Sequence, residues 1–354
     1  MGSLLQRPGV RLTLAAFAAG AWLCAAVALA ATPARTRLMT YITGLSTSPQ
    51  VWVANLNGSS PFDLGPASSA LISPNGSYVA AVSKGQTNKA STLSVYATGG
   101  GAAAVVVESP QIMQLPVGAW SSDSKLILVV VGASPADLDV VDVATGKSRT
   151  IATGVIYGAS FSPGSSDNVV YARGAPNKTP VNLYTTTSTG AGTRQLTHDG
   201  ASVEPLWGAH GIVYSDESAH AKTHTAQLQL WLINPDGSGA RQLTNIAIKS
   251  GWEGLTPIAI SADGEHVLAN LVGPPGSNDT EAYTVDLSAK KPPRDLTGQG
   301  SGYIGDAISS DGNWVLLTKG TANNLASFSV ELVKWPGGKP TTLVKQGAYA
   351  SWDR

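Results

Sequence analysis

The chain has 354 residues, and its 23 basic and 23 acidic side chains give a formal net charge of zero at pH 7. Lys and Arg form no long clusters, which argues against a nucleic-acid partner because phosphate binding requires a concentrated basic surface. Charged residues make up 13% of the chain, and Gly, Thr and Ser separate many short β-branched runs. This composition is typical of an all-β protein with many turns.

The first thirty residues differ from the rest of the chain. Arg7 and Arg11 precede an uncharged apolar run, residues 12–31, that contains a small-residue Ala-Leu-Ala sequence. This is the pattern of an export signal peptide. The run is also just long enough to span a bilayer, so retention as a membrane anchor stays open. We predict an exported protein, periplasmic, secreted or at the cell surface, with residues 1–30 as signal peptide or anchor and residues 31–354 as a single domain.

A turn motif recurs along the remaining sequence. It reads ISPNG from Ile72, WSSDS from Trp120, ISADG from Ile260 and ISSDG from Ile308. Repetition at a fixed period predicts an array of one supersecondary unit. Alignment on the large apolar residue before each turn gives seven positions at intervals of 41 to 53 residues: Ile72, Trp120, Phe161, Trp207, Ile260, Ile308 and Trp352.

Further short strands follow the first six of these positions. A second strand begins directly after the turn, for example at Tyr78 and at Trp314, and a third follows the next loop. The fourth ends in a Leu-Thr signature, RQLT at Arg194 and Arg241 and RDLT at Arg294. Four short antiparallel strands per repeat describe the blade of a β-propeller.

The two ends of the chain each carry part of one repeat. Residues 37–43 have the pattern of a second strand with no first strand before them, whereas residues 348–354 have the pattern of a first strand with nothing after them. We therefore predict a seven-bladed β-propeller in which the C-terminal strand joins the N-terminal blade and closes the ring. Closure of this kind removes exposed sheet edges.

Residues of the repeated turn have a structural interpretation. Ser and Asp oxygens accept hydrogen bonds from backbone N–H groups two or three residues further on, and Gly supplies a positive φ. We therefore interpret Asp263 and Asp311 as turn residues rather than catalytic acids. Trp52, Trp231 and Trp314 lie in strands and are expected to pack between blades.

These motifs resemble the TolB-like, or WD-like, β-propeller family, whose blades carry a WSPDG turn and an INPDG…RQLT hairpin. INPDGSGARQLT from Ile233 is a close match, and the resemblance covers residues 37–354. We expect no counterpart before these repeats of the α/β domain that precedes the propeller in TolB. The resemblance implies a propeller that serves as a periplasmic interaction platform, and related blades form substrate-gating domains in some peptidases.

Motifs for catalysis are missing from the sequence. It contains no GxSxG elbow, HExxH helix, phosphate loop or dinucleotide fingerprint. We predict a monomer with no catalytic residues, no bound metal and no cofactor. The longer loops, which join second to third and fourth to first strands, should gather on one face of the ring. We name this the long-loop face, and loops on a rigid scaffold commonly carry binding sites.

Two groups of residues on these loops are candidates for binding. Trp252 and Glu253 stand between two glycines, and an exposed Trp is a favoured interface anchor, although it could equally tuck beneath its own loop. The second group offers imidazole and carboxylate ligands, which could bind a divalent metal and support hydrolysis or β-elimination on a sugar acid, or could form a solvated polar loop. Its members are His198, Asp199, Glu204, His220 and His224, with Glu217 nearby.

The sequence therefore predicts an exported, non-catalytic propeller that binds a protein or cell-envelope ligand through its long-loop face. A metal-dependent carbohydrate-active enzyme, either a lyase or a hydrolase, is one alternative. A membrane-tethered sensor domain is another.

Overall fold

The computed structural model describes residues 38–83, 90–132, 135–175, 178–217, 227–277, 279–298, 302–320 and 327–353. Its regular elements over these ranges are β-strands, so the all-β prediction is confirmed. No helix within the same ranges has the length and apolar character needed to cross a bilayer. The predicted signal peptide or anchor, residues 1–30, lies outside the described residues, as do His220 and His224.

Five of the sheets in the described ranges have four antiparallel strands each, as the repeat predicts. One of them joins the two ends of the chain, in the order β27-β1-β2-β3. The strands of the five sheets are β27 (Gly347–Trp352), β1 (Leu38–Thr43), β2 (Gln50–Asn55) and β3 (Phe62–Pro66); β4 (Ser69–Ile72), β5 (Tyr78–Ser83), β6 (Ser91–Ala97) and β7 (Ala104–Ser109); β15 (Ser202–Gly208), β16 (Gly211–Asp216), β17 (Gln229–Ile233) and β18 (Arg241–Gln242); β19 (Gly254–Ile260), β20 (His266–Val272), β21 (Thr280–Asp286) and β22 (Arg294–Asp295); β23 (Tyr303–Ile308), β24 (Trp314–Lys319), β25 (Ser329–Lys334) and β26 (Thr341–Lys345).

The remaining sheet has seven strands because two predicted blades share one long strand. β11 pairs with β10 through its first half and with β12 through its second half. In the other repeats a loop separates the fourth strand from the next first strand, whereas here the connection itself is extended. Gly158, at φ 93°, lies where the register of β11 shifts against β12. The strands are β8 (Met113–Gln114), β9 (Leu126–Gly132), β10 (Ala136–Asp142), β11 (Ser148–Ser162), β12 (Ser165–Ala175), β13 (Lys178–Thr187) and β14 (Arg194–Gln195).

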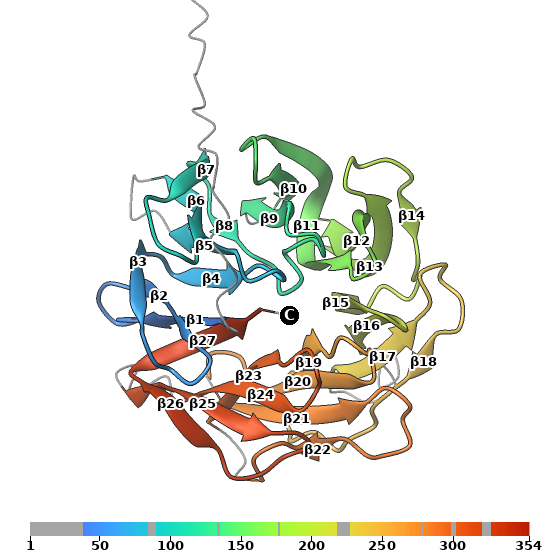
Figure 1. The fold of residues 1–354 in the computed structure, drawn as a ribbon. Coiled ribbons are helices and arrows are strands. Elements are labelled where there is room, and N and C mark those ends of the chain that lie inside the picture. The colour runs from blue at the N-terminus through green and yellow to red at the C-terminus, as the bar shows by residue number, and fades with distance from the viewer. Residues whose placement is uncertain are drawn as a thin grey trace, which may run out of the picture.

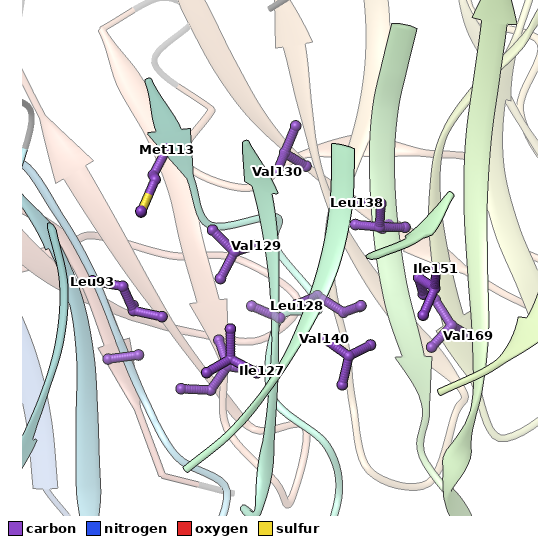
Figure 2. Packing of buried hydrophobic residues seen from close by; sticks show 14 of the residues in the cluster. Leu93, Met113, Ile127, Leu128, Val129, Val130, Leu138, Val140, Ile151 and Val169 are labelled. Atoms are coloured by element: carbon purple, nitrogen blue, oxygen red, sulfur yellow. The ribbon is translucent and has the colours of Figure 1, made fainter. Parts of the chain in front are cut away.

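The sheets are arranged around a common centre, where the C-terminus lies (Figure 1). In the five four-stranded sheets the first strand of the repeat is innermost, and each of them contacts an inner strand of a neighbouring sheet. These strands are β27, β4, β15, β19 and β23. The hydrophobic core lies in layers between adjacent sheets. Figure 2 shows part of one cluster, which joins Leu93 on β6 to Ile127 on β9 of the neighbouring sheet and continues past Leu138 on β10 to Val169 on β12, within the seven-stranded sheet. Each sheet therefore buries its faces against its neighbours.

The repeated turns have the predicted hydrogen bonds. The Ser309 hydroxyl donates to the Asp311 carboxylate, which accepts the Asn313 N–H at 3.1 Å. The Trp314 N–H donates to the Ser309 hydroxyl oxygen at 3.0 Å, and Gly312 has a φ of 68°. Because the acidic oxygens satisfy the turn's own backbone, the structural interpretation of these residues is confirmed.

Pairing between the two ends of the chain is also present, as the sequence predicts. β27 lies antiparallel to β1, with Met39 opposite Trp352 and Thr43 opposite Gly347. The Leu38 N–H donates to the Asp353 carboxylate at 3.3 Å. The last described residues therefore complete a sheet that the first described residues begin.

The strand tryptophans divide into two kinds. Trp52 and Trp231 are half-buried and pack against hydrophobic clusters, as expected. The expectation is wrong for Trp314, which is 39% exposed because it begins β24, at a strand end that the neighbouring sheets leave uncovered. Trp352 is 6% exposed and belongs to the cluster that joins the two ends of the chain.

Replacing Trp352 by Ala should lower the free energy of unfolding by about 3 to 5 kcal/mol, because it removes a large buried ring and leaves a cavity. Chemical denaturation monitored by circular dichroism measures the loss. Trp314→Ala is the matched control and should cost about 1 kcal/mol or less, since that ring is largely exposed. Equal losses in the two variants would contradict the burial described for β27.

Candidate functional site

A cavity of about 430 Å³ lies among the inner strands at the centre of the molecule. Its walls include the same position from every repeat of the sequence. Six of these residues stand at the end of an inner strand or one residue before it, and the seventh, Trp120, pairs with Ile127 in an isolated bridge. The seven positions are Ile72, Trp120, Phe161, Trp207, Ile260, Ile308 and Trp352.

Turn residues complete the wall at one end of this cavity. Pro74, Asn75, Ser122, Pro163 and Ala262 line it, and they come from the turns that join first to second strands. We name the face that carries these turns the turn face. Because every first strand runs from the long-loop face to the turn face, the cavity lies at the opposite end of the strands from the long loops.

Aromatic rings form much of the wall. The indole N–H of Trp120 donates to the Leu71 carbonyl at 3.0 Å and so fixes this ring against the inner strand of the neighbouring sheet. The large apolar surface of such rings is well suited to contact with a ligand, and indole and phenyl faces also attract cations. The aromatic residues that line the cavity are Trp120, Phe161, Trp207 and Trp352.

Serine hydroxyls in the cavity wall hold the inner strands to one another. The Ser160 oxygen accepts the N–H of Trp207 at 3.2 Å, and the Ser351 oxygen accepts the N–H of Ile72 at 3.0 Å. In both pairs the donor and the acceptor belong to different sheets. These contacts fix the spacing of the inner strands and hence the width of the cavity.

Asp306 is the one ionisable side chain among the described residues that line the cavity. The register between β23 and β24 shifts between Gly305 and Ala307, so Asp306 is the extra residue of a β-bulge. Its carboxylate accepts the Thr318 hydroxyl at 2.7 Å and the Ala350 N–H at 3.2 Å. Burial nevertheless raises the pKa of Asp306 to about 7, and the two hydrogen bonds oppose that rise only in part.

Tyr349 on β27 is linked to the same carboxylate. Its backbone N–H donates to the Thr318 hydroxyl oxygen at 2.6 Å, and that hydroxyl in turn donates to Asp306. Burial, and to a lesser extent the charge of Asp306, raises the pKa of the Tyr349 phenol. The acidic end of the cavity is therefore built jointly by β23, β24 and β27.

The predicted anchor Trp252 lies on the other face and is half-buried. It packs against a hydrophobic cluster beneath its own loop, and the Lys249 ammonium stands 4.5 Å from its ring centroid. That ammonium also pairs with Glu281 at 2.7 Å. Glu253 is exposed. The position of Trp252 matches the alternative in which it tucks beneath its loop, and its role in binding stays a prediction.

His198 and Asp199, from the second predicted group, are exposed. The Asp199 carboxylate accepts the Ala201 N–H at 3.1 Å and lies 2.9 Å from the Ser202 hydroxyl, which also lies 2.8 Å from Asp216. The structure thus brings Asp199 together with a turn N–H and a serine hydroxyl. This arrangement stabilises the start of β15.

Glu204 lies apart from that turn, in a bulge of inner strand β15 with a φ of 50°. Its carboxylate rests against Gly158 of the adjacent sheet, where an added Cβ would stand 2.6 Å from Oε2. Burial raises its pKa. Over the described part of the chain no three His, Cys, Asp or Glu side chains gather as a metal site would require, and His220 and His224 fall outside it.

No protein-family model matches this chain, and comparison with curated protein sequences gives no match. Solved structures do match. TolB from Acinetobacter baumannii is 14% identical over 89% of this chain and 82% of that chain, with a TM-score of 0.55. The fold of this chain is a TolB-like β-propeller. An oligogalacturonate lyase in complex with manganese is also 14% identical, over 80% of this chain and 82% of that chain, with a TM-score of 0.59.

The β-propeller domain of the Trilobed protease from Pyrococcus furiosus has a TM-score of 0.64, at 14% identity over 88% of this chain and 94% of that domain. That domain is described as having an open velcro topology, whereas in the present propeller β27 pairs with β1. At identities this low, the structural similarity establishes the fold and does not establish the biochemical function, because one fold serves many functions.

Replacing Asp306 by Asn should change how stability depends on pH. The folded protein holds the Asp306 proton up to a pH of about 7, whereas the unfolded chain releases it near the ordinary value of 3.8. The free energy of unfolding of the wild type should therefore fall, relative to Asp306→Asn, as pH rises from about 4 to about 7, by at most about 1.4 kcal/mol per pH unit. Urea unfolding of both proteins between pH 4 and 8 measures the difference. Parallel profiles would show that Asp306 ionises normally.

Proposed function

We propose that the protein is an exported, non-catalytic binding protein whose ligand, a protein segment or a component of the cell envelope, occupies the central cavity. One observation carries this proposal: the position that defines the repeat in the sequence is the position that lines the cavity in every repeat. A site built from all repeats is more than a local irregularity of packing. Concave, mostly apolar cavities with a few polar groups are the usual form of ligand sites.

The cavity's chemistry favours binding over catalysis. General acid–base or nucleophilic catalysis needs at least two reactive groups within reach of each other. Among the described residues of the wall, Asp306 is the one ionisable group, and the remainder are aromatic, aliphatic, amide or hydroxyl side chains and backbone. Such a wall can hold and orient a ligand.

The seven aligned positions support a propeller of seven blades in which β11 serves as outer strand of one blade and inner strand of the next. The pairing of β27 with β1 supports closure of the ring between the two ends of the chain. Export is supported by the basic and apolar pattern of residues 1–30. The ligand would then be one that is available outside the cytoplasm.

Site-specific photocrosslinking tests the proposal in the native host. Benzoylphenylalanine in place of Ala262, an exposed cavity-lining residue of the turn face, should yield a crosslinked ligand in the cell-envelope fraction. Filling the cavity in the same protein by Ala209→Trp should abolish that product while the protein remains folded, since Ala209 lines the cavity and is exposed.

The matched control places the same crosslinker at Glu253, which is exposed on the long-loop face. Crosslinks from position 253 with none from position 262 would contradict the cavity proposal and favour the long-loop face. Manganese bound to the purified protein, and lost when His198, His220 and His224 are replaced together, would instead favour the enzyme alternative.

A further inference from the structure

The cavity wall carries an acidic group and no basic group among its described residues. Its described lining residues include Asp306 and no Lys, Arg or His. The two hydrogen-bond donors to that carboxylate, the Thr318 hydroxyl and the Ala350 N–H, are both neutral. When Asp306 ionises, its charge therefore has no cation beside it among these residues.

The groups in contact with Asp306 supply no compensating charge. Lys319, which ends β24, is exposed, and its ammonium stands 5.6 Å from the ring centroid of Tyr303. β24 contributes the neutral Thr318, and inner strand β19 contributes the aliphatic Ile258 to the same wall. β27 contributes Ala350 and the phenol of Tyr349, whose raised pKa keeps it neutral near pH 7. A buried carboxylate without a counter-charge is costly to ionise, and a cation that reaches it recovers that cost.

The aromatic wall lies along the path from this carboxylate to the turn face. Asp306 is two residues before Ile308, a distance of about 7 Å along an extended strand. Trp207 and Trp352 occupy the same repeat position as Ile308 on their own inner strands, and both line the same cavity. A ligand with a cationic head and an apolar stem would place the head at Asp306 and the stem against these rings, which also attract cations.

We propose that the cavity binds an alkylammonium group, with the ammonium at the Asp306 carboxylate and the alkyl stem along Trp207 and Trp352. This inference rests on the proposed function, in which the cavity is the ligand site, and names the chemistry of its ligand. The group could belong to a free amine or to a lysine side chain of a protein partner. The cavity would recognise the ammonium and the alkyl stem in the same way in both cases.

Titration with hexylammonium, monitored by tryptophan fluorescence at pH 8, tests the proposal, with hexanol as the neutral probe of similar shape. The wild type should bind hexylammonium roughly tenfold or more tighter than hexanol, the usual scale for a charge-assisted contact. Asp306→Asn should bind the two probes equally. Asp236→Asn, which alters an exposed turn carboxylate, is the matched control and should bind as the wild type does.

The affinity of the wild type for hexylammonium should rise between pH 6 and 8, because Asp306 ionises over this range while an alkylammonium keeps its charge. The Asp306→Asn variant should show no such rise. Failure of hexylammonium to bind, equal wild-type affinity for hexanol, or unchanged affinity in Asp306→Asn would overturn the inference. Equal affinity for hexanol would still leave the cavity as a ligand site, whereas loss of crosslinking at position 262 would remove the proposed function itself.

A blocked Gly-Lys-Gly peptide, compared with the same peptide acetylated on its lysine, separates the two sources. Tighter binding of the unmodified peptide to the wild type, and not to Asp306→Asn, supports a protein partner. Binding of hexylammonium without binding of either peptide supports a free amine.

Discussion

The pairing of β27 with β1 is the interaction on which the centre of the molecule depends. It joins the two ends of the chain in one sheet and places Trp352 in the cavity wall. The same strand donates the Ala350 N–H to Asp306, and its Ser351 hydroxyl accepts the Ile72 N–H of the next sheet. The strand that pairs with β1 therefore also builds part of the cavity wall, so the conformational stability of this sheet and the geometry of the site are coupled.

Much of this fold is readable from the sequence because its determinants are local. The Ser-Asp-Gly turns carry their own hydrogen-bond acceptors, and the unmatched strands at residues 37–43 and 348–354 predict the pairing that β1 and β27 make. The continuous strand β11 was not predictable from turn signals, because its extended connection depends on pairing with strands on both sides. Repeat patterns fix which segments pair, and tertiary contacts decide where one strand ends.

The candidate site was harder to predict. The length of the loops predicts a binding site on the long-loop face, with Trp252 as its exposed anchor. In the structure the Trp252 ring packs on a hydrophobic cluster beneath its loop. The residues around the cavity have the same apolar types as the core, so their position facing an open space is invisible in the sequence. Asp306 resembles a solvent-facing strand residue, and its burial follows from a bulge in β23 and from the approach of β27. Both features join segments far apart in the chain.

The central claim is that the ligand occupies the cavity. Fluorine NMR of protein labelled with 5-fluorotryptophan tests it most directly, because an extract of the host's cell envelope contributes no fluorine signal of its own. Resonances are assigned by replacing one tryptophan at a time. The account predicts that adding the extract shifts the signals of Trp207 and Trp352, which line the cavity, and leaves that of Trp252 unchanged. A shift of the Trp252 signal with no change at Trp207 and Trp352 would contradict it.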